Sequence, residues 1–206
     1  MEQLFFMTDF DLIIPKILPT LTLSSVHEAK KVCDLLRTAK INSLEVTLRS
    51  GVSYEAIEYI SNESGINLGL GTVLNLKQLL KFKDLKITYV VSPGFDEGIS
   101  NYCKQEGVVY IPGIETASEI MNMIKHGHKK LKFFPAEQSG GVEKLKSFNA
   151  VFPEISFMCT GGINLINYKS YAELRNVFSV GGSFVLPKEF LIEDDLDEAV
   201  KYLQLL

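Results

Sequence analysis

Short apolar runs alternate with amphipathic segments from about residue 16 to the end of the chain. Apolar runs of this kind, bounded by turn residues, are typical of strands that are buried on both faces. They predict strands at 16–23, 43–48, 67–71, 87–91, 108–111, 131–134, 155–159 and 177–180. The segments between them place apolar residues at helical spacing. They predict helices at 26–38, 53–61, 76–81, 95–104, 116–124, 141–148 and 194–206.

The alternation of strands and helices predicts βαβ units and a parallel sheet, which is an α/β fold. About eight such units in 206 residues suit a compact (β/α)₈ TIM barrel, near the lower size limit of that fold. A doubly wound open sheet is the competing architecture. No linker rich in Pro, Gly or Ser divides the chain, so we expect residues 1–206 to form a single domain. The segment before Lys16 is expected to add an N-terminal helix that closes the bottom of the barrel.

A lysine stands inside the short apolar run that Pro135 closes. Side chains alternate along a strand, so Lys132 and Phe134 point one way while Leu131 and Phe133 point the other. An ammonium group in such a place loses its water, and its pKa falls. A neutral amine attacks carbonyl groups, which is how a Schiff-base lysine arises. The competing interpretation is a lysine whose charged head reaches solvent from the strand end.

The strand predicted at 43–48 alternates cleanly between polar and apolar residues. Glu45, Thr47 and Arg49 share one face, and the apolar residues between them share the other. If the polar face points into a barrel, Glu45 is a candidate general acid/base and Arg49 a candidate ligand for an anionic substrate group. A carboxylate inside a barrel is costly unless it is partnered. The competing interpretation therefore turns the polar face outward.

Glycines follow or end several predicted strands, and the last two glycine turns carry the most information. They follow the predicted seventh and eighth strands, where barrels commonly bind phosphate through backbone N–H groups. Glycine lets the backbone approach an anion closely, and a neighbouring hydroxyl group would add a donor. Each turn, considered alone, could also be a tight connection between two elements that binds no ligand. The two turns are Thr160-Gly161-Gly162 and Gly181-Gly182-Ser183.

Composition and charge narrow the class of protein. The chain is 46% hydrophobic and 22% charged, which is typical of a globular domain. Its net charge of −4, without a basic block, argues against nucleic acid or a membrane surface as a partner. The N-terminus lacks the basic region of a signal peptide, and no run is long enough to span a membrane. Three cysteines, far apart, fit a reducing environment, so we expect a cytoplasmic protein.

Two features resemble binding sites but are interpreted otherwise. The His126-Gly127-His128 run precedes the strand at 131–134, which places it on the stability face of a barrel. Lys129 and Lys130 beside it would repel a cation, so we interpret the run as a solvated turn. The acidic run at 193–195 precedes the last helix, where carboxylates complement the helix dipole. The sequence therefore predicts no metal site.

Seven motifs occur in order along the chain, and together they resemble the family of bacterial 2-keto-3-deoxy-6-phosphogluconate (KDPG) and 4-hydroxy-2-oxoglutarate (KHG) aldolases. The similarity covers nearly the whole chain, from about Lys16 to Pro187. Any one motif is a weak signal, whereas seven in register are specific. The motifs are Glu45-Val46-Thr47-Leu48-Arg49, Gly71-Thr72-Val73-Leu74-Asn75, Ser92-Pro93-Gly94, Ile111-Pro112-Gly113-Ile114, Lys132-Phe133-Phe134-Pro135-Ala136-Glu137, Thr160-Gly161-Gly162-Ile163 and Gly181-Gly182-Ser183.

The resemblance implies a class I lyase on a (β/α)₈ barrel that needs no metal or other cofactor and is usually a homotrimer. Lys132 would form the Schiff base with the keto carbon of the pyruvate portion, and Glu45 would shuttle protons. Cleavage would give pyruvate and glyceraldehyde 3-phosphate from KDPG, as in the Entner-Doudoroff route of carbohydrate metabolism, or pyruvate and glyoxylate from KHG. The small-molecule substrate is thus a keto acid, expected to be phosphorylated.

The resemblance also implies which residues bind the substrate. Arg49, Thr72 and Pro93 would line the pocket for the pyruvate carboxylate, and Phe134 would pack beside the imine. The distal phosphate would lie against the two glycine turns. Their predicted ligands are Gly161, Gly162 and Ser183, with Thr160 and Gly182 in the same turns.

The chain departs from the family pattern at a few positions. Thr20-Leu21-Thr22 stands where relatives tend to have a valine-rich segment, and Cys159 stands where a proline is common. These changes leave open the choice among KDPG, KHG and the galactonate epimer of KDPG. Two other functions remain as alternatives: a phosphate-binding barrel isomerase or synthase, and a non-catalytic protein that binds sugar acids.

Overall fold

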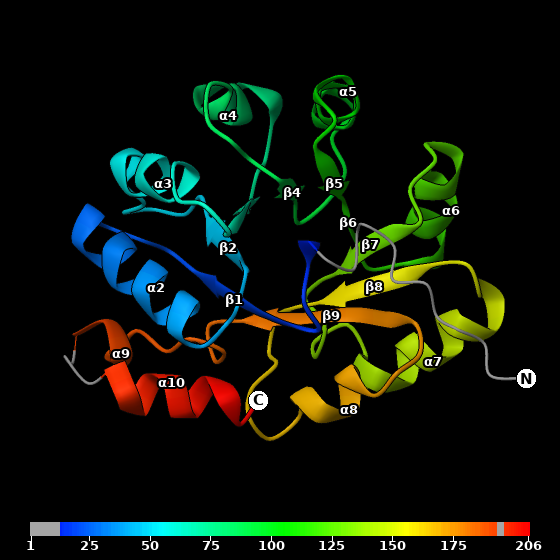
Figure 1. Cartoon of the computed structure of the whole chain (residues 1–206). Helices are drawn as coiled ribbons and strands as arrows, with labels where there is room; N and C mark the ends of the chain where they lie inside the picture. The colour runs from blue at the N-terminus through cyan, green and yellow to red at the C-terminus, as the bar shows by residue number, and fades with distance from the viewer. Residues whose placement is uncertain (1–12, 193–195) are drawn as a thin grey trace, which may run out of the picture.

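The strands form a closed parallel barrel in the computed structural model, which describes residues 13–192 and 196–206 (Figure 1). They pair in the order β5-β4-β3-β2-β1-β9-β8-β7-β6, and the register of each pair is parallel. The strands are β1 (Ile17–Leu21), β2 (Ser43–Thr47), β3 (Asn67–Gly71), β4 (Tyr89–Val91), β5 (Val109–Ile111), β6 (Gly113–Ile114), β7 (Lys130–Phe133), β8 (Ser156–Cys159) and β9 (Val177–Gly182).

The barrel closes at a strand that Pro112 interrupts, because proline has no N–H to continue the ladder. The first half of this strand, β5, pairs with β4, and the second half, β6, pairs with β7. The carbonyl of Pro112 still accepts a hydrogen bond from the backbone N of Lys132 at 2.8 Å. Counted with β5 and β6 as one, the described strands make the eight-stranded barrel that the sequence predicts. The open-sheet alternative is wrong.

Helices on the outside of the barrel connect the strands. They are α2 (Val26–Thr38), α3 (Tyr54–Ser61), α4 (Leu76–Leu79) with the 3₁₀ turn η1 (Leu80–Phe82), α5 (Glu97–Glu106), α6 (Ala117–Lys125), α7 (Gly141–Val151), α8 (Tyr168–Ala172), α9 (Glu189–Ile192) and α10 (Leu196–Gln204). Polar caps fix several starts: Ser25 Oγ accepts from the backbone N of Glu28 at 3.2 Å, and Thr116 and Glu119 form a capping box. None of the described helices is long and apolar enough to cross a membrane.

The predicted helices and the observed ones differ mainly at their ends. α2 has the predicted bounds, whereas α8 and α9 were not predicted, because helices this short show no helical period in the sequence. The N-terminal helix expected before Lys16 falls mainly on residues 1–12, which lie outside the described residues. The acidic run at 193–195, predicted to cap the last helix, lies outside them as well.

The core has an inner part inside the barrel and an outer part between the strands and the helices. The inner part includes Leu18, Tyr89, Val91, Ile111 and Met158, all almost fully buried. Tyr89 fits there because β3 offers a glycine opposite: a Cβ added at Gly69 would lie 2.0 Å from the Tyr89 ring. These side chains fill the middle of the barrel, and a ligand cavity lies beyond them, toward the C-terminal ends of the strands.

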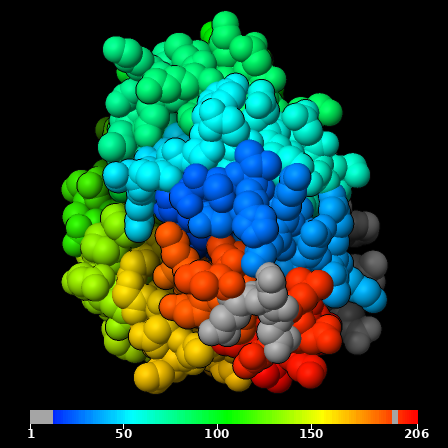
Figure 2. Space-filling model, turned by 90° about the vertical axis from the view of Figure 1, so that its left-hand side faces the viewer, coloured from blue at the N-terminus to red at the C-terminus, as the bar shows by residue number. Residues whose placement is uncertain are grey.

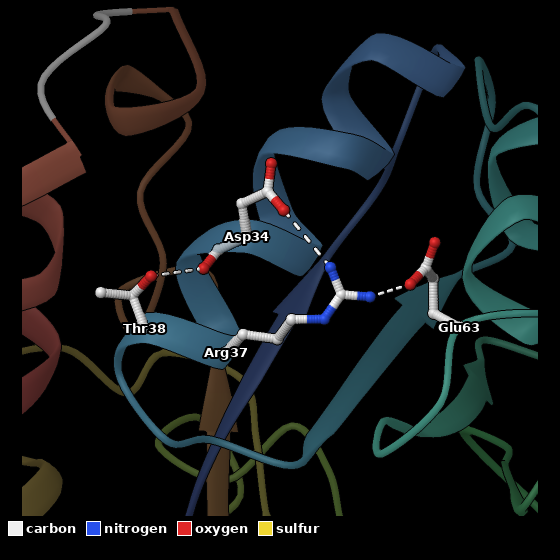
Figure 3. Close-up of polar contacts among 4 residues, drawn as sticks. All are labelled: Asp34, Arg37, Thr38 and Glu63. Carbon is white, nitrogen blue, oxygen red and sulfur yellow. Dashed lines mark hydrogen bonds and ion pairs between the residues drawn. The ribbon is translucent and has the colours of Figure 1, made fainter.

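The outer surface carries a polar cluster that joins α2 to the loop after α3 (Figure 3). Arg37 pairs with Asp34 at 3.3 Å and with Glu63, and Thr38 Oγ1 donates to the carbonyl of Asp34 at 2.8 Å. The Arg37 and Asp34 side chains are largely exposed, so the pair between them contributes at most about 1 kcal/mol. This cluster holds neighbouring helices on the outside and does not extend into the barrel.

The turn at His126 and His128 is less solvated than predicted. His128 is half-buried, and its Nε2 lies 2.9 Å from Ser100 Oγ. The ring of Phe95 packs against His126 at a centroid distance of 4.6 Å and against His128 at 5.9 Å. The solvated turn is therefore wrong for His128, because Phe95, in the loop before α5, and Tyr110 on β5 pack against its ring.

The C-terminal ends of the strands share one side of the molecule. The arrowheads of β8 and β9 point to the left of Figure 1, and Figure 2 looks onto that side. On this face the orange segment after β9 lies between the blue segment that begins at β1 and the yellow turn after β8 (Figure 2), as expected from the pairing of β9 with both strands. Segments from both ends of the chain thus meet where barrel enzymes place their active sites.

Candidate active site

Lys132 points into the barrel from β7. Its strand neighbours Leu131 and Phe133 are fully buried on the outer side. There the Phe133 ring packs against the ring of Phe148 on α7, with the two ring centroids 6.1 Å apart. Period-two alternation then leaves Lys132 on the inner side, where it is only 6% exposed. The interpretation of Lys132 as a surface lysine is therefore wrong. Its Nζ lies 5.2 Å from the centre of the Phe134 ring, which provides an apolar wall beside the amine.

Glu45 reaches the same point from the opposite side of the barrel. Leu44 and Val46 pack outward against α2 and α3, so Glu45 points inward and is fully buried. β2 and β7 lie across the barrel from each other, yet Glu45 Oε1 lies 3.9 Å from Lys132 Nζ. This separation is an ion-pair contact and too long for a hydrogen bond. The interpretation of the Glu45 face as an outward polar edge is wrong.

Burial shifts the pKa of both groups toward their neutral forms. Desolvation raises the pKa of Glu45, and the nearby charges of Lys132 and Arg49 only partly offset this effect. Desolvation lowers the pKa of Lys132; Glu45 opposes that change, and Arg49 adds to it. Neither carboxylate oxygen of Glu45 accepts a hydrogen bond within the described part of the chain. The site therefore holds an amine that is easily deprotonated beside a carboxyl group that is easily protonated.

A glycine on β3 makes room for Glu45. The carboxylate packs against Gly71, where an added Cβ would lie 2.0 Å from Oε1. The next residue, Thr72, has a φ of +59°, a left-handed conformation that is strained for a β-branched residue. Backbone hydrogen bonds hold both sides of this strained turn, from Leu48 N to Gly71 O at 2.8 Å and from Val73 N to Val91 O at 3.2 Å. Strained backbone of this kind commonly occurs at functional sites.

Gly71→Ala is expected to lower the activity that the family resemblance implies by at least about 100-fold, because the new methyl group displaces the Glu45 carboxylate by about an ångström. The measurement is kcat for the pyruvate release expected from that resemblance. Gly94→Ala is the matched control, since nothing lies within 4 Å of a Cβ added there. Equal activity of Gly71→Ala and the wild type would show that the position of Glu45 is unimportant.

Lys132 and Glu45 lie at the base of a cavity of about 440 Å³ that opens at the C-terminal face. The cavity brings together nine of the residues predicted from the sequence. They are Glu45, Arg49, Lys132, Phe134, Thr160, Gly161, Gly162, Gly182 and Ser183. Thr72 and Pro93 do not line it. Pro93 lines an adjoining hollow of about 350 Å³ that shares Phe134 with the main cavity.

The two glycine turns form part of the cavity wall. Gly161 and Gly162 have φ values of +96° and +74°, which favour glycine, and a Cβ at Gly161 would lie 2.9 Å from Pro135 Cα. Gly182 lies near the first turn, because a Cβ added to it would be 3.9 Å from the carbonyl of Ile163. Thr160 is buried, and its Oγ1 has no hydrogen-bond partner in residues 13–192 and 196–206. Within this part of the chain, the buried hydroxyl therefore lacks a hydrogen-bond partner beside the cavity.

Eight further cavity residues were not among the site residues predicted from the sequence. Thr20 and Thr22 alternate on β1 and its extension, and Thr22 Oγ1 lies 2.6 Å from Thr47 Oγ1. Alternating threonines followed by a polar face on the next strand could have indicated them. Leu186 and Lys188 lie beyond the last glycine turn, and no pattern in the sequence indicates that they line the cavity. The full set is Thr20, Leu21, Thr22, Thr47, Ile163, Gly181, Leu186 and Lys188.

A family model for KDPG and KHG aldolases matches residues 11–202. The chain belongs to this aldolase family. Among its relatives, the KHG/KDPG aldolase of Escherichia coli is 34% identical over 186 residues, which are 90% of this chain and 87% of the relative. The resemblance found in the sequence motifs is thereby confirmed.

Solved aldolase structures share the fold over nearly the whole chain. The KDPG aldolase of Legionella pneumophila, with pyruvate captured as a covalent carbinolamine, has a TM-score of 0.88 and 30% identity, covering 95% of each chain. The KDPG aldolase of Zymomonas mobilis ZM4, with 3-phosphoglycerate, has a TM-score of 0.84 and 31% identity, covering 95% of this chain and 92% of that one. Family membership and fold agree with the geometry of the Lys132–Glu45 pair.

Proposed function

We propose that this protein is a class I aldolase that cleaves KDPG to pyruvate and glyceraldehyde 3-phosphate, and KHG to pyruvate and glyoxylate. The observation that carries the proposal is the buried amine of Lys132, 3.9 Å from the buried carboxyl group of Glu45. Aldol cleavage needs an electron sink next to the breaking bond, and a protonated imine supplies one. A relative that is 30% identical holds pyruvate covalently as a carbinolamine, which precedes such an imine.

Lys132 performs the covalent steps. Its neutral amine adds to the C2 carbonyl of the keto acid, and proton transfer gives the carbinolamine. Loss of water then gives the protonated imine. The C4 hydroxyl loses its proton, the C3–C4 bond breaks to release the aldehyde, and the electron pair passes to the imine nitrogen as an enamine. Protonation at C3 and addition of water release pyruvate and restore the amine.

Glu45 carries the protons in this sequence. Carbinolamine formation, water loss and loss of the C4 proton each need a group that both gives and takes a proton close to Nζ. A carboxyl group whose pKa is raised by burial suits this task near neutral pH. Glu45 Oε1 lies 3.9 Å from Lys132 Nζ. At this distance the carboxyl group can exchange protons with the reacting atoms directly or through a single water.

The remaining predicted residues are assigned to the two ends of the substrate. Arg49 lines the cavity, its charge affects the pKa of both Glu45 and Lys132, and it binds the carboxylate of the pyruvate portion. Thr72 follows Gly71, which contacts Glu45, and Pro93 lines the adjoining hollow. The turns at 160–162 and 182–183 bind the distal anion through backbone N–H groups and hydroxyls. The bound 3-phosphoglycerate in a relative supports a phosphorylated ligand.

We also propose a cytoplasmic homotrimer, which is what the family resemblance implies. All three cysteines are buried and free, in keeping with a reducing compartment. The trimer is tested by light scattering of the purified protein, where the mass of a monomer or a dimer would contradict it.

The proposed function is tested by measuring pyruvate release from KDPG, KHG and the galactonate epimer of KDPG with a coupled lactate dehydrogenase assay. We expect turnover of KDPG and KHG, with the higher kcat/KM for KDPG. Binding of both acids without pyruvate release would instead favour a non-catalytic sugar-acid-binding protein.

A further inference from the structure

The cavity has an excess of positive charge that the chemistry at Lys132 does not use. Its lining includes three cationic side chains, Arg49, Lys132 and Lys188, and one carboxyl group, Glu45. Arg49 and Lys132 are the cations whose charges act on Glu45, so both belong to the reacting end. Lys188 follows the last glycine turn, on the loop that also carries Ser183 and Leu186 into the cavity. The third cation therefore lies on the segment assigned to the distal end of the substrate.

Lys188 stands on a segment whose backbone is held firmly. Val185 N donates to Gly182 O at 3.2 Å, and the side chains of Val185 and Leu186 are each 1% exposed. The hydroxyl of Tyr202 on α10 donates to the carbonyl of Phe184. Beyond the lysine, Leu191 N donates to Lys188 O at 2.9 Å. These contacts fix the base of the Lys188 side chain at the cavity rim.

The charged head of Lys188 is available to a ligand. The residue is exposed, and within the described part of the chain no carboxylate forms an ion pair with it. A lysine side chain is long and flexible, so its ammonium can follow an anion that enters over the rim. The two glycine turns beside it offer only neutral donors, namely backbone N–H groups and hydroxyls.

We propose that Lys188 binds the distal phosphate of the substrate and sets the preference of the enzyme for phosphorylated over unphosphorylated keto acids. This proposal rests on the proposed aldolase function. A phosphate ester carries nearly two negative charges at neutral pH, whereas the distal carboxylate of KHG carries one. Hydrogen bonds between charged groups are about twice as strong as neutral ones. KDPG is also longer than KHG, so its phosphate extends farther toward the rim.

Lys188→Met tests the proposal because methionine keeps most of the apolar stem and removes the charge. We expect kcat/KM for KDPG to fall about tenfold, mainly through KM, while kcat/KM for KHG changes by less than about twofold. Lys188→Arg should retain most of the preference for KDPG. Lys104→Met, at an exposed position on α5 outside the cavity, is the matched control for loss of one surface charge. The loss in Lys188→Met should shrink as salt is added.

The outcomes separate this proposal from the proposed function. Borohydride trapping with pyruvate alone reports only on the reacting end and should be the same for the wild type and Lys188→Met. If the wild type traps no pyruvate, the aldolase function fails. If both proteins trap pyruvate but Lys188→Met keeps the wild-type preference for KDPG, or loses KDPG and KHG activity equally, the role of Lys188 alone is overturned.

Discussion

Lys132→Met is expected to abolish pyruvate release from both KDPG and KHG, lowering kcat by more than about 10⁴-fold, because methionine cannot form the imine that accepts the electrons of the breaking bond. Methionine fills a similar volume, so the cavity keeps its shape. The lactate dehydrogenase-coupled assay measures the loss. Lys129→Met, three residues earlier and exposed, is the control and should keep full activity. Substantial turnover by Lys132→Met would remove the imine from the mechanism.

The same substitution should make the protein more stable. Burial lowers the pKa of Lys132, so the charged form is disfavoured in the folded state. The stability that this group contributes is present at high pH and is lost as the pH falls through its folded pKa, which lies below 10.5. At pH 7 we therefore expect Lys132→Met to raise the free energy of unfolding, because methionine has no charge to desolvate. Glu45, whose pKa is raised, can stay neutral without its partner. Urea unfolding measures this difference, and a less stable variant would contradict the account of a desolvated amine.

Glu45→Gln is expected to lower kcat by about 10²- to 10⁴-fold while leaving slow imine formation, because an amide of the same size cannot carry a proton. The variant also removes the charge that holds up the pKa of Lys132, so a larger fraction of the amine is neutral. Attack on the carbonyl should therefore survive, and the proton-dependent steps should limit the rate. Single-turnover kinetics separates imine formation from cleavage.

The control for this prediction is Glu143→Gln, which removes a surface carboxylate that pairs with Lys146 at 2.7 Å. Its kcat should equal that of the wild type. Full turnover by Glu45→Gln would exclude Glu45 from proton transfer. Loss of imine formation together with cleavage would instead mean that the carboxylate is needed for the first addition step.

Much of the barrel and its buried Lys132–Glu45 pair could be predicted from the sequence, because alternation decides which side chains meet. Once Leu131 and Phe133 are assigned to the outer face of their strand, Lys132 must point inward, and the same argument places Glu45. Barrel closure then brings the two together from strands that are far apart in sequence. The bounds of α2 were predictable for a related reason, since Ser25 supplies a polar cap before a regular apolar period.

Other parts of the site depend on tertiary packing that no local pattern reveals. The division of one strand at Pro112 follows from its two partners, β4 and β7. The close contact between Gly71 and Glu45, and the left-handed backbone of Thr72, require the neighbouring strand to be in place. Lys188 enters the cavity because Val185 and Leu186 anchor its loop, and exposed lysines look alike in a sequence.

The account is tested most directly by treating the wild-type protein with pyruvate and borohydride and locating the adduct by peptide mass spectrometry. We predict one reduced adduct, on the peptide that contains Lys132, formed faster as the pH rises through an apparent midpoint below 10.5, the ordinary pKa of lysine. The absence of an adduct, or an adduct confined to another lysine, would contradict the claim that the buried amine of Lys132 is the nucleophile.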